Sequence, residues 1–324
     1  MVGKEGLIVL GSERPWRRSI FRILMYVLWG RSGAHTQDWL PGLSLTIPQQ
    51  PFETGTIVYR GNSISPLLHP AVLKNSASQE IFIIGSGPSL RSNDLSLIGP
   101  RTAILLNGAI SLLTEGIDAP LAVAIEDERF VWRHFQLMAE KIGAGSTCLF
   151  STAVIRAICE INDDWLADKT VILIDNIRKP YGGKRREYSQ LADLDFVRVH
   201  ADEAGFSSDP SKGVFQGGSV AVSAFQFAAY CKPATIGFFG VDISNANGPR
   251  FYERIGSIAK SGIAHAKRRI LAHVVLGVGV CIAQGTEVLN FSPISALSEC
   301  GLPYDSRYAW ASAQKDDLAV EHSE

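Results

Sequence analysis

Several common signals are missing from this 324-residue sequence, and each absence argues against a class of protein. The five cysteines are scattered, without a CxxC pair or a zinc-ligand spacing, which predicts reduced, buried thiols in a cytosolic protein. The net charge of −1 offers no basic surface for bulk binding of nucleic acid. No apolar core with a small-residue cleavage site follows the N-terminus, so no secretory signal is predicted.

Two common nucleotide-binding motifs are incomplete or absent. Residues 80–91 read EIFIIGSGPSLR, where the dinucleotide motif GxGxxG would need glycine in place of Leu90. No acidic residue ends a clear second strand about 20 residues further on, where a ribose would be held. No GK[ST] follows, so the turn is not a P-loop. A nicotinamide-dependent oxidoreductase is therefore disfavoured.

What the segment does contain is a buried-strand run that ends in a glycine turn. The run, residues 81–84, is followed by Gly85, Ser86, Gly87, Pro88 and Ser89. Proline suits the first turn of a helix, expected over residues 88–98, and free N–H groups at a helix start attract phosphate. The pattern predicts a nucleotide or sugar nucleotide at the carboxyl end of a parallel strand. The simpler alternative, that both glycines only shape a strand–helix turn, stays open.

Strands and helices are expected to alternate from residue 80 onward. The candidate strands are residues 81–84, 102–106, 121–125, 147–150, 170–174, 235–239 and 278–282. The candidate helices are residues 88–98, 130–142, 153–161, 219–230 and 264–276. This alternation predicts an α/β fold with a Rossmann-like, mostly parallel sheet and helices on both faces.

The domain is expected to cover residues 80–300, followed by a polar tail over residues 301–324. A polar insert over residues 176–215 interrupts the alternation and is a candidate lid or acceptor-binding region. Its basic run, Lys184, Arg185 and Arg186, predicts a solvated loop, with acceptor phosphates or acidic sugars as the alternative partner.

Residues 1–79 are expected to lie outside that domain, with an irregular connector over residues 34–79 that contains short extended pieces such as residues 56–60. Residues 15–31 predict a basic, aromatic helix that carries Trp16, Arg17, Arg18, Arg22, Trp29 and Arg31. Its apolar run, residues 23–29, is shorter than the roughly 20 residues that span a bilayer. We expect an interfacial helix on an anionic membrane surface. A helix packed on the domain, with its arginines in water, is the alternative.

Three further features follow the same pattern as the first turn. Asn107 ends the run at residues 102–106 and offers an amide that can donate to or accept from a base or sugar. A glycine turn at Gly217, Gly218 and Ser219 precedes the helix expected at residues 219–230, and the strand at residues 235–239 ends in Gly240, Val241 and Asp242. Because α/β folds bind ligands at the carboxyl ends of their strands, the set favours ligand binding more than any one turn does.

Together these residues resemble a known family. The series GSGPSL, then Asn107, then a Gly-Gly-Ser helix start, then a strand ending in Gly-Val-Asp is similar to bacterial sialyltransferases of the Campylobacter type and to related lipopolysaccharide-core enzymes that add Kdo. The resemblance covers about residues 80–295 and implies a single-domain GT-A-like glycosyltransferase fold with a CMP-activated keto-sugar acid as donor. The implied CMP site comprises Gly85, Ser86, Gly87, Pro88, Ser89, Asn107, Gly217, Gly218, Ser219, Gly240, Val241 and Asp242.

The resemblance also implies one histidine base downstream of the Gly-Val-Asp turn. His265 occupies that place, and His273 is the structural alternative. The family has aromatic hydroxyls just after this turn to hold the leaving phosphate, whereas this sequence has Ile243 and Ser244. The candidates for that role are therefore Tyr252 and Arg250.

The expected chemistry needs neither a metal nor a cofactor. A neutral imidazole can take the proton of an acceptor hydroxyl as it attacks the anomeric carbon. CMP leaves with one phosphate, whose charge hydroxyls, N–H groups or an arginine can meet. Asp193-Leu194-Asp195 matches the DxD motif, but we expect these acids on a solvated face. Glu126 and Asp127 follow a predicted strand and could touch the donor or the acceptor.

The sequence thus predicts an inverting glycosyltransferase that moves Kdo, or sialic acid, from its CMP ester to a hydroxyl of a lipopolysaccharide-core or other surface glycan. We expect it in the cytoplasm, peripheral on the inner face of the inner membrane, and favour Kdo because a membrane-facing N-terminus suits a lipid-linked acceptor. The alternatives are a GxGPSL-type pyrophosphokinase or other nucleotide-binding enzyme that needs magnesium, and a non-catalytic scaffold.

Overall fold

The computed structural model describes residues 16–33, 35, 42–114, 116–200, 203–243 and 263–310. At the centre of these residues lies a ten-stranded sheet in the order β1-β2-β3-β8-β7-β6-β5-β4-β11-β12. The strands are β1 (Leu43–Thr46), β2 (Thr54–Tyr59), β3 (Asn62–Leu68), β4 (Glu80–Ile84), β5 (Ala103–Leu106), β6 (Ala122–Ile125), β7 (Thr147–Ser151), β8 (Thr170–Ile174), β11 (Thr235–Phe239) and β12 (Glu287–Asn290). All pairings from β3 to β12 are parallel, while β1, β2 and β3 form an antiparallel meander. The expected α/β, mostly parallel sheet is confirmed.

Helices cover both faces of the sheet. They are α1 (Trp16–Gly33), α2 (Ala71–Ser76), α3 (Glu128–Lys141), α4 (Thr152–Asn162), α5 (Tyr188–Ala192), α6 (Val220–Tyr230) and α7 (Ile263–Ala283). Along β4, Phe82 and Ile84 pack in the same core as α3 and α4, whereas Ile81 and Ile83 pack in the core that includes α6 and α7. A strand covered on both faces reads as a continuous apolar run, which explains why β4 was visible in the sequence.

The connector expected over residues 34–79 is more regular than predicted, because from Leu43 onward it forms β1, β2, β3 and α2, and the extended piece expected at residues 56–60 overlaps β2. β3 pairs in parallel with β8, so the three strands of the meander belong to the main sheet and do not form a separate N-terminal segment. The three strands have four, six and seven residues, and β1 alternates buried with exposed residues. One face of the meander therefore packs on the core, and the sequence shows only a weak apolar signal there.

Two other elements differ from expectation. Residues 88–98 form two short 3₁₀ segments, η2 (Pro88–Ser92) and η3 (Leu95–Leu97), in place of one helix. Residues 278–282 lie inside α7, and the last strand is β12, further along the chain. The β-branched run stays helical because Gly277 brings α7 against the rings of Phe206 and Phe225, where a Cβ atom would overlap them.

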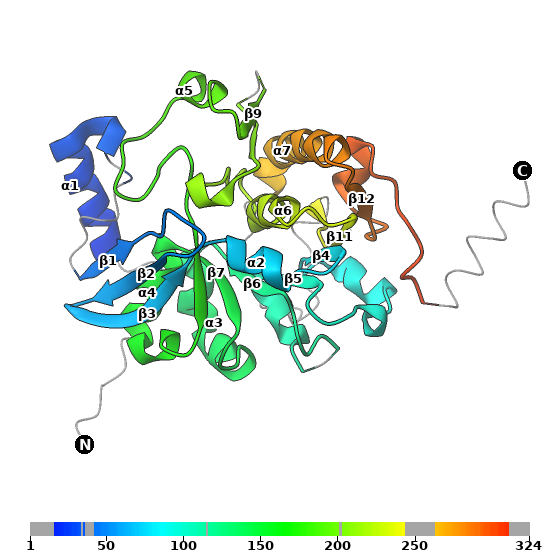
Figure 1. The fold of residues 1–324 in the computed structure, drawn as a ribbon, viewed down its shortest axis with the longest axis horizontal. Helices are drawn as coiled ribbons and strands as arrows, with labels where there is room; N and C mark the ends of the chain where they lie inside the picture. The colour runs from blue at the N-terminus through cyan, green and yellow to red at the C-terminus, as the bar shows by residue number, and fades with distance from the viewer. Residues whose placement is uncertain are drawn as a thin grey trace, which may run out of the picture.

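The insert over residues 176–215 has a small core of its own. It contains α5 and the antiparallel pair β9 (Val197–Val199) and β10 (Gly205–Ser207), packed around Ile177, Leu191, Val197 and Phe215. In Figure 1 it lies between α1 at one end of the molecule and α7 and β12 at the other. Its expected role as a lid stays a prediction.

The polar tail expected from residue 301 begins later than predicted. Up to Trp310 the chain packs on the domain, since the Tyr308 ring lies 5.4 Å from that of Phe82 and the Trp310 indole donates to the carbonyl of Arg91 at 3.0 Å. The remaining residues of the tail lie outside the described structure.

Candidate functional site

The order of the strands identifies one place in the sheet where ligands characteristically bind. From β4 the chain proceeds through β5, β6, β7 and β8 to one side, and β11 and β12 lie on the other side of β4. The order therefore reverses between β4 and β11. In open α/β sheets, ligands occupy the crevice outside the carboxyl ends of the strands at such a switch point.

The turns that follow β4 and β11 meet at this point. The Gly85 N–H donates to the carbonyl of Phe239 and the Gly87 N–H to that of Gly240, both at 2.8 Å. A Cβ atom at Gly85 would overlap the Gly240 carbonyl, and one at Gly87 would overlap the carboxylate of Asp242. Both glycines are therefore required by contact between the turns, which is a packing role that the sequence left open.

Asp242 closes the start of η2. Its Oδ2 accepts from the Ser89 N–H at 2.8 Å and its Oδ1 from the Ser89 hydroxyl at 2.6 Å. Burial raises the pKa of Asp242, opposed by its hydrogen bonds from Ser89. The Ser89 N–H that was expected to attract phosphate is thus bonded to a carboxylate, and a ligand phosphate would need other donors at this edge.

Asn107 stands at the carboxyl end of β5 in a left-handed conformation. Its φ is +46°, in the region that asparagine adopts more readily than most residues other than glycine. Its Oδ1 atom is buried and has no hydrogen-bond donor among the described residues. An unsatisfied buried acceptor costs about 1–3 kcal/mol, and this cost marks Asn107 as a group that could accept from a ligand.

Glu126 occupies the equivalent position at the end of the neighbouring strand β6. The Ser223 hydroxyl of α6 donates to Glu126 Oε2 at 2.5 Å, and the Ser151 hydroxyl donates to the Glu126 carbonyl at 2.7 Å. Burial raises the pKa of the Glu126 carboxyl to about 7, although the residue keeps part of its surface exposed. Such a carboxyl can exchange protons near neutral pH.

Asp127, the other acid considered at this edge, has a structural role. Its side chain caps α3 by accepting from the Arg129 N–H at 3.0 Å. This contact is a typical N-cap interaction, in which a carboxylate satisfies a free N–H group of the first turn. Of the two acids, only Glu126 is therefore a candidate for contact with a ligand.

The Gly-Gly-Ser turn before α6 packs against α7. Gly217 and Gly218 have φ values of +53° and +96°, and Ser219 caps α6 by accepting from the Ala221 N–H. The Arg269 Nε donates to the Gly217 carbonyl at 2.9 Å, and a Cβ atom at Gly218 would overlap its guanidinium. Arg269 is exposed at this turn, so the turn carries a cation that the sequence did not single out.

The proposed base lies on α7, but only its backbone is described. His265 falls in the first turn of α7, while Arg250 and Tyr252 lie outside the described residues. His273 is buried, its Nδ1 lies 2.8 Å from the Arg269 carbonyl, and its ring packs 6.0 Å from that of Phe215. These contacts give His273 a structural role in the core.

The DxD match has no metal-site geometry. Asp193 and Asp195 are both exposed, as expected of a solvated face. Within the described ranges, no three His, Cys, Asp or Glu side chains come together as metal ligands would.

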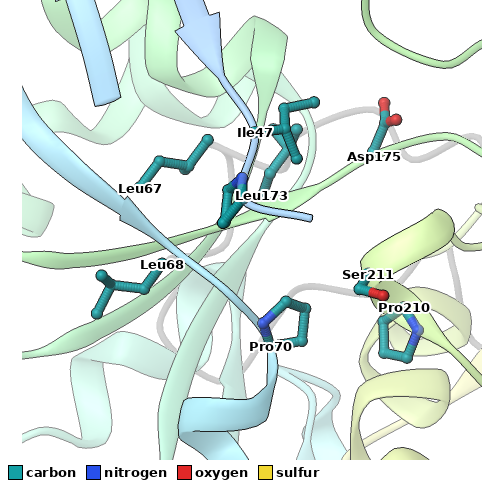
Figure 2. A pocket seen from close by; sticks show the side chains of 9 residues that line it. Ile47, Leu67, Leu68, Pro70, Leu173, Asp175, Pro210 and Ser211 are labelled. Carbon is teal, nitrogen blue, oxygen red and sulfur yellow. The ribbon is translucent and has the colours of Figure 1, made fainter. Parts of the chain in front are cut away.

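A hollow lies farther along the same edge, at the ends of β3 and β8. Figure 2 shows its lining, which consists of Ile47, Pro48, Leu67, Leu68, Pro70, Leu173, Asp175, Pro210 and Ser211. Its accessible volume of about 10 Å³ is the size of one water molecule. It is therefore far too small for a nucleotide and is not the candidate site.

Comparisons with known proteins give little beyond this geometry. No family model and no curated protein sequence matches the chain. Among solved structures, the chain is similar to the sialyltransferase CstII from Campylobacter jejuni, determined in complex with the substrate analogue CMP-3FNeuAc. The identity is 14%, the TM-score is 0.39, and the match covers 71% of this chain and 88% of that one. A likeness at this level assigns no role to any residue of the site.

Proposed function

We propose that the chain is an inverting glycosyltransferase that transfers Kdo, or sialic acid, from its CMP ester to a hydroxyl of a lipopolysaccharide-core or other surface glycan. The observation that carries this proposal is the pairing of Ser89 with Asp242. It joins the GSGPSL and Gly-Val-Asp motifs, 153 residues apart, at the switch point of the sheet. Asn107 and Glu126 stand on the next strand ends, so the motif residues and the groups able to bind a ligand share one edge.

The reaction is a single displacement. The acceptor oxygen forms a bond to the anomeric carbon, the bond from that carbon to the phosphate oxygen breaks, and the electron pair leaves with CMP. His265 takes the acceptor proton in the neutral imidazole form. Attack from the face opposite the leaving group inverts the anomeric centre.

The negative charge that develops on the leaving phosphate needs a cation or several N–H donors. Arg250 and Tyr252 are the residues proposed from the sequence. Arg269 is a third candidate. Its guanidinium lies beside the Gly217–Gly218 turn, where it donates to the Gly217 carbonyl. With one phosphate to neutralise, these groups make a metal unnecessary in the proposed mechanism.

Glu126 is a second group that could take the acceptor proton. Its carboxyl has a pKa of about 7, so above about pH 7 it is mostly ionised and can act as a base. The two candidates are distinguished by turnover in His265→Ala and Glu126→Gln variants. Loss of the base lowers turnover by about 10²–10⁴-fold, whereas loss of a group that only positions substrate leaves the pH profile in place.

Thermal melting with CMP, UDP, GDP, NAD and ATP, each with and without magnesium, tests the donor class. A ligand present at 100 times its dissociation constant stabilises the protein by about 2.7 kcal/mol, which is readily measured. We expect CMP alone to raise the melting temperature without metal. Stabilisation only by ATP with magnesium would instead indicate the pyrophosphokinase alternative, and stabilisation only by NAD an oxidoreductase.

A further inference from the structure

Helix α1 turns an apolar stripe away from the rest of the described structure. Ile20, Ile23, Leu24, Val27 and Leu28 follow the i, i+3, i+4, i+7, i+8 spacing of one helix face, and all five are exposed. The exposed fraction reaches 66% at Ile23 and 73% at Val27. An amphipathic helix normally packs this face on a core, so the stripe requires another explanation.

The opposite face of α1 is fixed to the protein. Met25 is buried, with 4% of its surface exposed. Arg18 forms ion pairs with Glu128 at 3.2 Å and Glu160 at 3.0 Å, at the start of α3 and near the end of α4. Arg18 therefore does not face a membrane, in contrast to expectation. Because these contacts fix the rotation of the helix, they also fix the apolar stripe on its outward face.

Positive charge adjoins the stripe at its carboxyl end. The helix bends at Gly30, where φ is +63°, and Figure 1 shows this bend at the end of α1 nearest the insert. Beyond it, the Ser32 carbonyl accepts from the Arg185 N–H at 3.0 Å. This bond brings the exposed side chains of Arg31 and Lys184 to the same end of the helix.

We infer that α1 is an in-plane anchor for an anionic membrane surface. The apolar stripe would enter the boundary between headgroups and acyl chains, with Arg31 and Lys184 at the anionic headgroups. Within the described structure, no helix is long and apolar enough to cross a membrane, so the helix would lie in the interface. A second copy of the chain could cover the stripe but would leave the adjoining cations without anions, whereas an anionic bilayer meets both.

The anchor would hold one end of the carboxyl edge of the sheet (Figure 1) against the membrane. The loop that contacts α1 follows β8, and its Tyr181 N–H donates to Asp175, directly after that strand, at 3.0 Å. The contact therefore lies at the carboxyl edge of the sheet, where the candidate site also lies. This placement suits a lipid-linked acceptor, a point that rests on the proposed function. The inference that α1 is an anchor does not rest on it.

Co-sedimentation with vesicles tests the anchor without any assay of activity. The vesicles would be of phosphatidylcholine, with or without a third of phosphatidylglycerol. We expect the full chain to sediment with the anionic vesicles. Replacing Ile23→Asp and Val27→Asp together should lower the partition coefficient about a hundredfold, since two apolar side chains no longer enter the bilayer. Ile282→Asp is the matched control, because Ile282 is 67% exposed on α7, and it should bind as the parent does.

A charge series gives the second arm. Arg31→Glu and Lys184→Glu should each weaken binding to anionic vesicles by about fivefold or more, and added salt should weaken binding of the parent. Equal binding of the parent and the Ile23/Val27 variant would overturn the inference, as would failure of the parent to bind anionic vesicles. A parent that is a dimer by light scattering, and a monomer in that variant, would place a second copy on the stripe instead.

Discussion

The turns after β4 and β11 differ from the strand ends of β5 and β6 in how their polar groups are satisfied. At the first pair, Gly85, Gly87 and Ser89 all donate within the protein, and Asp242 accepts two short hydrogen bonds from Ser89. At the second pair, Asn107 Oδ1 has no donor among the described residues and Glu126 holds a carboxyl with a pKa of about 7. The two regions adjoin along one edge of the sheet.

From this difference we expect the first region to act mainly as scaffold and the second mainly in recognition. The glycine-rich motif, which looks in sequence like the binding element, forms a clasp between two strands. The groups still open to a ligand are Asn107 and Glu126, which lie one and two strands away from β4. Substitutions in the first region should therefore act on stability, and substitutions in the second on ligand binding and pH dependence.

The largest effect on stability is expected from Gly87→Ala. The added Cβ atom would overlap the Asp242 carboxylate and the Gly240 carbonyl, so the free energy of unfolding should fall by about 3 kcal/mol. Denaturant titration measures this change. Gly279→Ala is the matched control, because Gly279 lies in α7 with open space around it, and there alanine should stabilise by up to about 1 kcal/mol. If both variants change the free energy of unfolding by the same small amount, Gly87 is not held in a tighter contact than the exposed Gly279, and the account is contradicted.

Glu126→Gln should change how stability depends on pH. The pKa of Glu126 is raised from 4.5 to about 7, so the folded state favours the protonated form. The associated stability is fully present below about pH 4.5 and is lost as the pH rises from there through 7, a decrease of about 3 kcal/mol. Glutamine keeps the acceptor for Ser223 but does not titrate. The free energy of unfolding of the parent should therefore fall over this range relative to that of the variant, and parallel curves would contradict the burial of this carboxyl.

Asn107→Gly should have the smallest effect, and it should fall on binding alone. Glycine adopts a φ of +46° without strain and removes the unsatisfied oxygen, so stability should stay within about 1 kcal/mol of the parent. One lost hydrogen bond should weaken CMP binding by about tenfold, as measured by calorimetric titration. If CMP affinity is unchanged, the donor to Asn107 comes from elsewhere in the protein.

The sequence predicted the centre of the fold better than its edges. β4 to β8 and β11 were predicted from the sequence because strands covered on both faces are continuous apolar runs. The helices α3, α4 and α6 were predicted because each has a regular apolar pattern with clear ends. Of β1 to β3, only the extended piece at residues 56–60 was expected, because these strands alternate between buried and less buried residues and because β3 includes Pro66, which is unusual within a strand. Residues 278–282 were assigned to a strand because β-branched residues favour strands locally, while the packing of Gly277 on α6 decides for a helix.

The sequence predicted which motif residues lie at this edge of the sheet but not their contacts. The spacing of motifs along the chain placed Gly85, Asn107 and Asp242 at one edge of a sheet. It could not reveal that Asp242 binds Ser89, or that Glu126 binds Ser223, because those pairs are 153 and 97 residues apart. The raised pKa of Glu126 follows from burial, opposed by the hydrogen bond from Ser223, so it could not be predicted from the sequence either. Arg269 was missed because one arginine in a helix carries no motif.

The most direct test of the central claim is release of CMP from CMP-Kdo and CMP-sialic acid, in the presence of acceptor glycan and a metal chelator. The account predicts that the parent releases CMP from one of these donors. His265→Ala should lose about 10²–10⁴-fold in rate while it is stabilised by CMP as much as the parent is. Absence of release from both donors, in a protein that CMP does stabilise, would contradict the proposed transfer and leave a CMP-binding protein without this activity.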